Sequence, residues 1–423
     1  MSLPRGFRLF RTTMSGEKIY EGVFAVHKPQ GVTSADVIRK LQSHLKPSEL
    51  FRPWIEHERI ERARSSSREA KFSRKRRNKN IDVKIGHGGT LDPLATGVLV
   101  TGVGKGTKQL NDFLGCTKTY EAVVVFGAET DSYDRLGKIV RRGPYAHITR
   151  EGVEKALAQF RGKIMQHPPI FSALKVKGKK LYEYAREGQL PPIEIQARPV
   201  EVSNLEILEW YEPGTHEHKW PEEEAPEEEK SVAEKLLAKD DALPVAASAE
   251  EGQPEKQVLE TSSATKRPAE SQEEEKEQSA ATTTEVTADD SIPAPKKQKV
   301  SDAAQDAPTE QSAATTIAET TESSESKPET TACPQPPAVK ITMTVSSGFY
   351  VRSLAHDLGK ALGSCALMCE LSRTRQADFT LDSDKILEYK DLDAGEKVWG
   401  PKVQSFLEEW EEKRERDARA GSS

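Results

Sequence analysis

The chain has 423 residues, 31% of them charged, and a formal net charge of −6 at pH 7. Residues 221–338 hold 28 acidic and 11 basic side chains, a net charge of −17, so the other residues carry a net charge of +11. Composition excludes a membrane protein, because no apolar run approaches the ~18 residues of a membrane span, and the basic part suits a polyanionic partner.

The N-terminal segment, residues 1–17, is basic and partly amphipathic. Its first 14 residues contain Arg5, Arg8 and Arg11 and no acidic residue. This pattern is typical of a mitochondrial presequence. Met14 offers a second start that would remove most of the segment.

Hydrophobic periodicity predicts strands and helices that alternate along the chain. Apolar, β-branched runs indicate strands, and apolar residues spaced three or four apart behind a Ser or Thr cap indicate helices. The predicted strands are residues 22–28, 98–103, 120–126, 200–210, 339–345 and 371–379. The predicted helices are residues 34–44, 107–113, 149–162, 351–362 and 403–419.

One loop combines glycines, a carboxylate and a proline. Residues 86–99 read GHGGTLDPLATGVL, with Asp92 at the centre. The glycines allow a bend and a close approach of a ligand. Pro93 biases Asp92 toward an extended conformation. Either an Asp-Pro turn before a strand or a catalytic carboxylate fits this pattern.

Two segments interrupt the predicted core. Residues 45–84 form a polar, basic insertion whose run Arg74–Arg77 suits either RNA contact or nuclear import. Residues 211–337 form an acidic, low-complexity insertion that we expect to be disordered, because it can bury little apolar surface. The strands on either side of it should pair as one hairpin, since a hairpin tip tolerates a long loop.

This arrangement predicts one split catalytic domain, residues 18–210 plus 338–385, followed by a charged helical tail at residues 386–423. Cys365 and Cys369 form a CxxxC pattern on a stretch that we predict to be helical. No second cysteine pair accompanies it, so we expect no metal site. The free thiols indicate a reducing compartment.

Five segments resemble the motifs of the TruB-type tRNA pseudouridine synthases and follow one another along the chain in the same order. The resemblance covers residues 20–210 and 338–382 and leaves out the N-terminus, the acidic insertion and the tail. The matching segments are residues 27–34 (HKPQGVTS), 86–99, 118–120 (KTY), 168–186 (PPIFSALKVKGKKLYEYAR) and 348–359 (GFYVRSLAHDLG).

The resemblance implies an α/β pseudouridine-synthase fold: a mixed, mainly antiparallel sheet with flanking helices and an RNA-binding cleft. It implies a cofactor-free, monomeric isomerase that acts on uridine 55 in the T-loop of tRNA; messenger RNA stays open as a second substrate. A guide-dependent rRNA synthase and a tRNA-folding chaperone are the alternatives. Only about 40 residues follow Phe379, too few for the family's PUA domain, so we expect no guide RNA.

The resemblance also assigns roles to residues. It implies that Asp92 is catalytic, that Arg352 pairs with it, and that Tyr120 stacks on the extruded uracil. Arg352 could instead be a solvent-exposed arginine at the start of a helix, and Tyr120 could be a half-buried tyrosine of a strand. The remaining matched residues would bind substrate. His87 would fill the gap in the RNA stack, and Tyr350 and Leu371 would contact the base. Lys28, Lys118 and Lys175 would contact phosphates.

The chemical route stays open at this stage. The carboxylate could attack C1′ or base C6 as a nucleophile, or remove a ribose proton. A second basic island, residues 295–300 (PKKQKV), resembles a nuclear import signal. Together with the presequence-like segment it predicts two locations, the nucleus and the mitochondrion.

Overall fold

The computed structural model describes residues 11–13, 16–68, 81–169, 172, 174–187, 189, 192–193, 195–227, 230 and 335–421. Three predicted features lie outside these residues: most of the presequence-like segment, the basic run Arg74–Arg77, and the acidic insertion from residue 231 to residue 334. The description below concerns the described residues alone.

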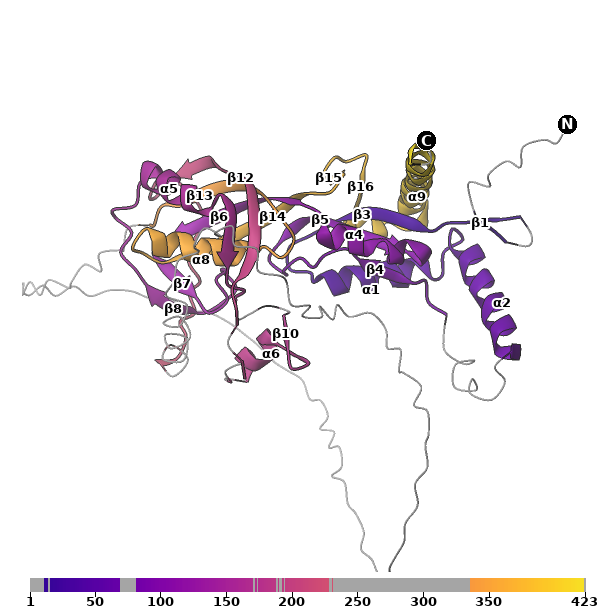
Figure 1. Cartoon of the computed structure of the whole chain (residues 1–423), viewed down its shortest axis with the longest axis horizontal. Coiled ribbons are helices and arrows are strands. Elements are labelled where there is room, and N and C mark those ends of the chain that lie inside the picture. Colours follow the sequence, from indigo (N-terminus) through magenta and orange to yellow (C-terminus); the bar gives the residue numbers. More distant parts are fainter. Residues whose placement is uncertain are drawn as a thin grey trace, which may run out of the picture. The chain divides into compact units, whose positions relative to one another are not determined.

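A large mixed sheet forms the centre of the molecule (Figure 1). Neighbouring strands are antiparallel except at two places, where β16 (Ile386–Glu388) pairs with β3 (Gly22–Lys28) and β14 (Ala366–Gln376) pairs with β5 (Thr96–Val103). The expected mixed, mainly antiparallel α/β fold is therefore confirmed. In sheet order the strands are β16 (Ile386–Glu388), β3 (Gly22–Lys28), β5 (Thr96–Val103), β14 (Ala366–Gln376), β6 (Lys118–Phe126), β13 (Ala338–Val345), β12 (Arg198–Tyr211) and β9 (Gly162–Gln166), with β4 (Ile85–His87) on β5 and β15 (Phe379–Thr380) on β14.

Three small hairpins stand beside this sheet. Sequence periodicity did not predict them, because each strand has only two to four residues, too few to show an alternation. They are β1 (Arg11–Thr12) with β2 (Lys18–Ile19), β7 (Ala128–Thr130) with β8 (Ile139–Arg142), and β10 (Lys175–Val176) with β11 (Lys179–Lys180).

Helices pack around the sheet, and three of them begin or end as their sequence predicts. Thr149 caps α5 (Arg150–Leu157), and its side chain accepts from the Gly152 N–H. At α1 the Thr33 side chain accepts from the Asp36 backbone N–H, while the Asp36 carboxylate accepts in return. Gly363, with φ +64°, follows the end of α8. The helices are α1 (Ser34–Leu45), α2 (Arg52–Arg68), α4 (Leu110–Gly115), α5 (Arg150–Leu157), α6 (Leu181–Arg186), α8 (Val351–Ala361) and α9 (Glu396–Ala420), with 3₁₀ turns η1 (Gly104–Lys108), η2 (Ala158–Phe160) and η4 (Tyr389–Leu392).

The strands on either side of the acidic insertion do pair as predicted. In the antiparallel β12–β13 hairpin, Val202 faces Val345 at one end and Tyr211 faces Ala338 at the other. β13 in turn pairs with β6 along its whole length. One sheet is thus built from both sides of the insertion, as a split domain requires.

The prediction that residues 211–227 belong to a disordered insertion is wrong. Within them, Glu223 and Ala225 form backbone hydrogen bonds with Ile139 of β8. The Trp220 indole N–H donates to the Phe126 carbonyl at 2.8 Å, and Ala225 is buried. Trp220 supplies the apolar surface that holds this segment, and the aromatic-free composition begins only after it.

The CxxxC segment is a strand, not a helix. Cys369 and the residues around it lie in β14, which pairs with β6 on one side and touches β5 on the other. A short, fully buried apolar run has no period that separates strand from helix, so tertiary position decides. Both Cys365 and Cys369 are buried and free.

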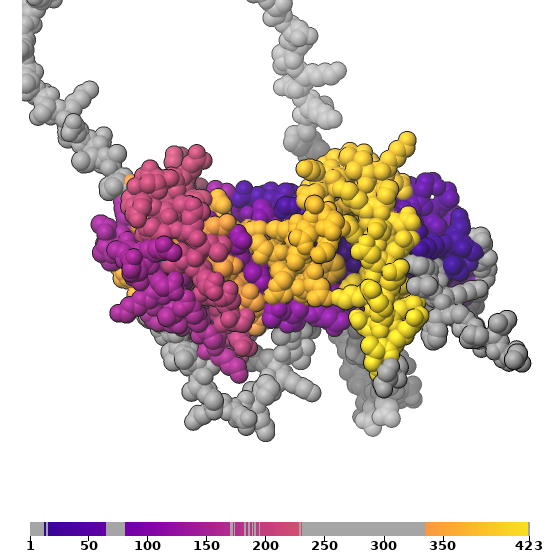
Figure 2. Space-filling model, turned by 90° about the horizontal axis from the view of Figure 1, so that it is seen from above, coloured from indigo at the N-terminus to yellow at the C-terminus, as the bar shows by residue number. Residues whose placement is uncertain are grey.

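The C-terminal tail is more than one charged helix. Residues Ile386–Glu388 add the parallel edge strand β16. Helix α9 begins at Glu396, seven residues earlier than predicted, and buries Trp399 and Leu407. Figure 2 shows α9, in yellow, lying against the indigo N-terminal part of the chain. No helix among the described residues is long and apolar enough to cross a membrane.

We expect Gly97→Ala to destabilise the fold by about 2 kcal/mol. Gly97 has φ +106°, and a Cβ there would lie 2.2 Å from the Arg373 carbonyl oxygen where β5 meets β14. Urea-induced unfolding measures the change. Gly115→Ala is the matched control, because nothing lies within 4 Å of a Cβ at Gly115. Equal unfolding midpoints for the two variants would contradict this account of the strand junction.

Candidate active site

The Asp92 loop joins β4 to β5 and is bonded to the first residue of α1 and to the segment that precedes this helix. The Leu91 N–H donates to the Ser34 hydroxyl at 2.9 Å, and the Gly31 N–H donates to the Pro93 carbonyl at 2.8 Å. Leu91 and Leu94 are buried on either side of the acid. The Asp92 side chain keeps 34% exposure, so the carboxylate is fixed in place yet reachable.

Three buried polar side chains hold the backbone carbonyls of this loop. Lys28 donates to the Pro29, Pro93 and Ala95 carbonyls. Arg373 donates to the Val98 carbonyl at 2.8 Å and the Gly89 carbonyl at 3.2 Å. Gln376 donates to the Gly88 carbonyl at 2.6 Å. Since buried carbonyls must be paired, these side chains determine the path of the loop.

The prediction that Lys28 and Lys118 contact phosphates is wrong. Lys28 is 0% exposed, and burial lowers the pKa of its ammonium to about 8, although nearby Asp92 raises it. Lys118 is 6% exposed and donates to the Leu114 and Cys116 carbonyls. Both ammonium groups are used inside the protein. Lys175 lies on the β10–β11 hairpin with an exposed side chain, as a phosphate contact requires.

Asp92 and Arg352 form the ion pair that the resemblance implied. The Arg352 Nε lies 2.9 Å from Asp92 Oδ2 and its Nη2 lies 3.3 Å from Oδ1. Arg352 is the second residue of α8, and its side chain is only 7% exposed. A two-point contact of this kind fixes both the position and the orientation of the carboxylate.

The turn between β7 and β8 completes the surroundings of Arg352, and sequence reasoning missed it. Arg352 Nη1 donates to the Ser132 carbonyl at 3.0 Å, and Asp134 Oδ2 lies 3.8 Å from Arg352 Nε. Burial raises the pKa of the Asp134 carboxyl, while Arg352 lowers it. The acidic run at residues 129–134 (ETDSYD) was a usable signal, but a carbonyl contact leaves no trace in sequence.

A second buried ion pair lies one helical turn along α8. The His356 Nδ1 is 2.7 Å from Glu129 Oε1, and Arg141 binds the other Glu129 oxygen at 2.6 Å. The His356 ring stacks on Tyr133 with 4.3 Å between ring centroids. Burial raises the pKa of Glu129, but the His356 imidazole and the Arg141 guanidinium together hold it below its usual value. These groups tie α8 to the β7–β8 hairpin.

The other predicted base-binding residues lie around the same loop. Tyr120 is 9% exposed on β6, directly across from Arg373. The backbone of Tyr350, just before α8, is held at both its N–H and its carbonyl by the Gln166 side chain. Burial lowers the pKa of His87, and nearby Arg373 lowers it further, so the imidazole favours its neutral form.

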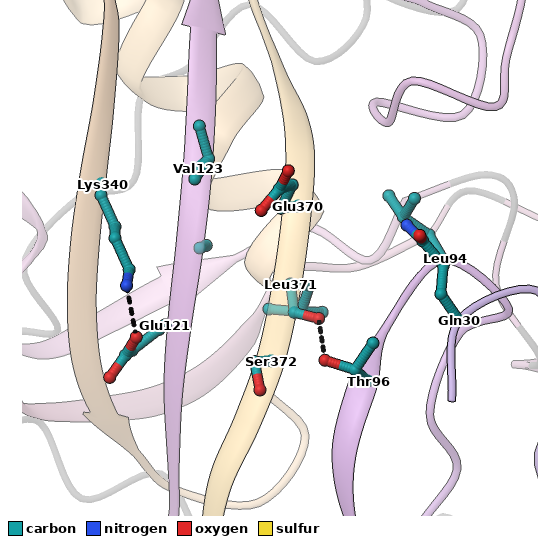
Figure 3. Close-up of a pocket in the computed structure, with 10 residues that line it drawn as sticks. Gln30, Leu94, Thr96, Glu121, Val123, Lys340, Glu370, Leu371 and Ser372 are labelled. Atoms are coloured by element: carbon teal, nitrogen blue, oxygen red, sulfur yellow. Dashed lines mark hydrogen bonds and ion pairs between the residues drawn. The ribbon is translucent and has the colours of Figure 1, made fainter. Parts of the chain in front are cut away.

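Leu371 lies at a hollow of about 220 Å³ beside the β5–β14 junction, drawn in Figure 3. The junction itself is short, with Thr96 opposite Ser372 and Gly97 opposite Arg373. Leu94, two residues after Asp92, shares the hollow, which therefore adjoins the Asp92 loop. Its lining residues are Gln30, Leu94, Thr96, Glu121, Ala122, Val123, Lys340, Glu370, Leu371 and Ser372.

The site so assembled offers one carboxylate fixed by a guanidinium, with aromatic and aliphatic side chains nearby. Such a carboxylate can act as a nucleophile, as a base or as a stabiliser of positive charge at a sugar carbon. Within the described ranges, no three His, Cys, Asp or Glu side chains are grouped as metal ligands.

Comparison with known proteins matches two family models. Residues 74–220 match the N-terminal domain of the TruB family of pseudouridylate synthases. Residues 352–409 match the C-terminal domain of tRNA pseudouridylate synthase B. The second match reaches into α9, beyond the end of the resemblance seen in the sequence.

Curated relatives match most of the chain. It is 38% identical to tRNA pseudouridine synthase 4 of Schizosaccharomyces pombe, over 88% of this chain and 83% of the relative. It is 32% identical to tRNA pseudouridine synthase 4 of Saccharomyces cerevisiae, over 92% and 85%. A chain in the crystal structure of a Cbf5–Nop10–Gar1 complex aligns at 18% identity with a TM-score of 0.40, over 92% of this chain and 58% of that one. By its matches to the family models and to these full-length relatives, the chain belongs to the TruB family of pseudouridylate synthases.

Proposed function

We propose that this enzyme isomerises uridine 55 in the T-loop of tRNA to pseudouridine, with Asp92 as the catalytic carboxylate. The observation that carries the proposal is the Asp92–Arg352 ion pair, held at 2.9 Å on a loop whose backbone is fixed by buried side chains. The tRNA substrate follows the names of the relatives, which are tRNA pseudouridine synthases.

The atoms and protons of the proposed reaction balance without a cofactor. The N1–C1′ bond breaks, the uracil turns, and C5 bonds to C1′; the C5 proton is lost and N1 gains a proton. The Asp92 carboxylate would start the sequence at C1′, at base C6 or at a ribose proton, and all three routes need it fixed and reachable. Arg352 supplies the fixed position, and the 34% exposure of Asp92 supplies access.

Binding of the RNA would rest on other groups. A base inside a folded RNA must leave its stack, and Tyr120, Tyr350 and Leu371 would then contact it while His87 fills the gap. A neutral His87 suits insertion among bases, because it carries no charge that must be desolvated. Exposed lysines such as Lys175 would contact the phosphates.

We also propose that the protein acts in the nucleus and in mitochondria. The proposal rests on sequence alone, because most of the presequence-like segment and all of the basic island at residues 295–300 lie outside the described residues. Substrates would then be the tRNAs of both compartments.

We expect Asp92→Asn to abolish pseudouridine formation while tRNA binding stays within about tenfold of wild type. The amide keeps the shape of the carboxylate and removes its charge and basicity. The measurement is single-turnover reaction with an unmodified tRNA transcript and site-resolved detection of pseudouridine. Asp384→Asn, at an exposed position, is the control. Product formed by Asp92→Asn would remove Asp92 from its role; wild-type product at another position would contradict position 55.

We expect Lys175→Ala to change the affinity for tRNA and Lys28→Met to change the stability and the reaction rate. Loss of an exposed phosphate contact should weaken tRNA binding and lower the slope of log K against log salt by about 1. Loss of the buried ammonium should lower the unfolding midpoint and the reaction rate with an unchanged salt slope, because Lys28 holds loop carbonyls. A reduced salt slope for Lys28→Met would restore it as a phosphate contact.

We expect residues 1–13 to direct import into mitochondria. A full-length Met14→Ala form and a form that starts at Met14, each with a C-terminal fluorescent tag, separate the two translation products. The first should enter mitochondria and the second should stay in the nucleus and cytosol. Equal mitochondrial entry of both forms would show that residues 1–13 are not the presequence.

A further inference from the structure

The turn between β7 and β8 supports Arg352, and the turn needs support of its own. It offers the Ser132 carbonyl to Arg352 and places Asp134 beside it. The Asp134 carboxylate accepts from the Ser132 hydroxyl at 2.8 Å and from the Leu136 N–H at 3.0 Å. Tyr133, between Ser132 and Asp134, has φ +61°, a backbone conformation that is costly for an aromatic residue. Surrounding contacts must therefore hold it.

One side of the turn is held by the main sheet. The Met368 N–H donates to the Tyr133 carbonyl at 3.0 Å, and the Arg135 N–H donates to the Met368 carbonyl at 3.0 Å. The Tyr133 ring stacks on His356 of α8. These contacts fix the inner side of the turn against β14 and α8.

The other side is held by residues 216–227, which we name the strap. The strap runs beside β8: the Ile139 N–H donates to the Glu223 carbonyl and the Ala225 N–H donates to the Ile139 carbonyl, each at 2.9 Å. Glu224 pairs with Arg142 at 3.1 Å. The strap is thus a third strand-like segment of the β7–β8 hairpin.

Two strap side chains, Ala225 and Trp220, contact the β7–β8 hairpin or a residue just before it. Ala225 is 4% exposed and forms a small apolar cluster with Tyr133 and Val140. Trp220 donates to the Phe126 carbonyl, just before β7, and the Arg142 guanidinium lies 5.1 Å from its ring centre. An unbroken series of contacts therefore runs from Ala225 through Tyr133 and Ser132 to Arg352.

We propose that the strap positions Arg352 for the reaction, so that Trp220 and Ala225 are positioning residues of this enzyme. The inference rests on the proposed function, because it assigns the strap to the geometry of the Asp92–Arg352 pair. A small displacement of Tyr133 moves the Ser132 carbonyl and Asp134 together, and both face Arg352. Misplacement of a catalytic group by about 1 Å costs large factors in rate.

The test measures rate, binding and stability separately for four strap variants. Ala225→Leu pushes on Tyr133, Trp220→Ala removes the ring, and Trp220→Phe restores an aromatic ring without the indole N–H. His216→Ala is the control, because His216 bonds to the Pro336 carbonyl and not to the hairpin. Each is assayed by single turnover on tRNA transcript, by tRNA Kd and by thermal unfolding.

We expect Ala225→Leu and Trp220→Ala to slow single turnover by about tenfold or more with Kd within about twofold of wild type. Trp220→Phe should recover most of the rate, and His216→Ala should keep it even if its unfolding midpoint falls. Unchanged rates in folded Ala225→Leu and Trp220→Ala proteins would overturn the proposal. Absence of pseudouridine with the wild-type protein would instead contradict the proposed function.

Deletions keep the test decisive if the point variants do not fold. Replacing residues 228–334 with a flexible Gly/Ser linker leaves the strap in place and should preserve the single-turnover rate. Replacing residues 216–334 in the same way removes the strap and should lose the rate but keep tRNA binding. Equal rates for the two deletions would show that the strap only covers the sheet.

Discussion

The Asp92–Arg352 ion pair is the interaction on which the rest of the site depends. It joins the loop before β5 to the start of α8, two elements 260 residues apart in sequence. Arg352 is almost fully buried, and a buried charge is tolerated only when it is paired and hydrogen-bonded. The Asp92 carboxylate and the Ser132 carbonyl meet that need, and Asp134 adds a second negative charge nearby. The same contacts that allow this burial also fix the Asp92 carboxylate, the group proposed to be catalytic.

The loop that carries Asp92 is held by cations that never reach the surface. Lys28 and Arg373 come from β3 and β14, on either side of β5, and both donate to carbonyls of the loop or of the strand that follows. A basic residue in a motif of an RNA-binding protein suggests phosphate contact, but here the charge compensates backbone carbonyls in the core. Lys175, by contrast, is exposed, so its ammonium is available for the phosphate contact proposed above.

The long insertion is placed where it disturbs the sheet least, yet its first residues are part of the site's support. β12 and β13 pair up to Tyr211 and Ala338, so the insertion leaves and re-enters the sheet at one point. The chain then turns back along β8 before it leaves the described structure after Lys230. A boundary between fold and insertion drawn from composition alone falls too early, because Ala225 is buried and Trp220 is partly buried in a segment rich in glutamate.

The sequence by itself determined the long elements and the pairing of the strands on either side of the insertion, since periodicity and caps are local. Asp92 and Arg352 followed only from the resemblance of its motifs to those of a known family. The sequence did not determine the short β7–β8 hairpin, the strand character of Cys369 or the burial of Lys28, because those depend on what packs on each side. Ser132 and Asp134 were missed for the same reason: a carbonyl contact and a neighbouring carboxylate have meaning only once Arg352 is folded against them. Tertiary structure alone decided which basic residues are exposed to solvent and which hold the loop, because that choice is set by packing and not by residue type.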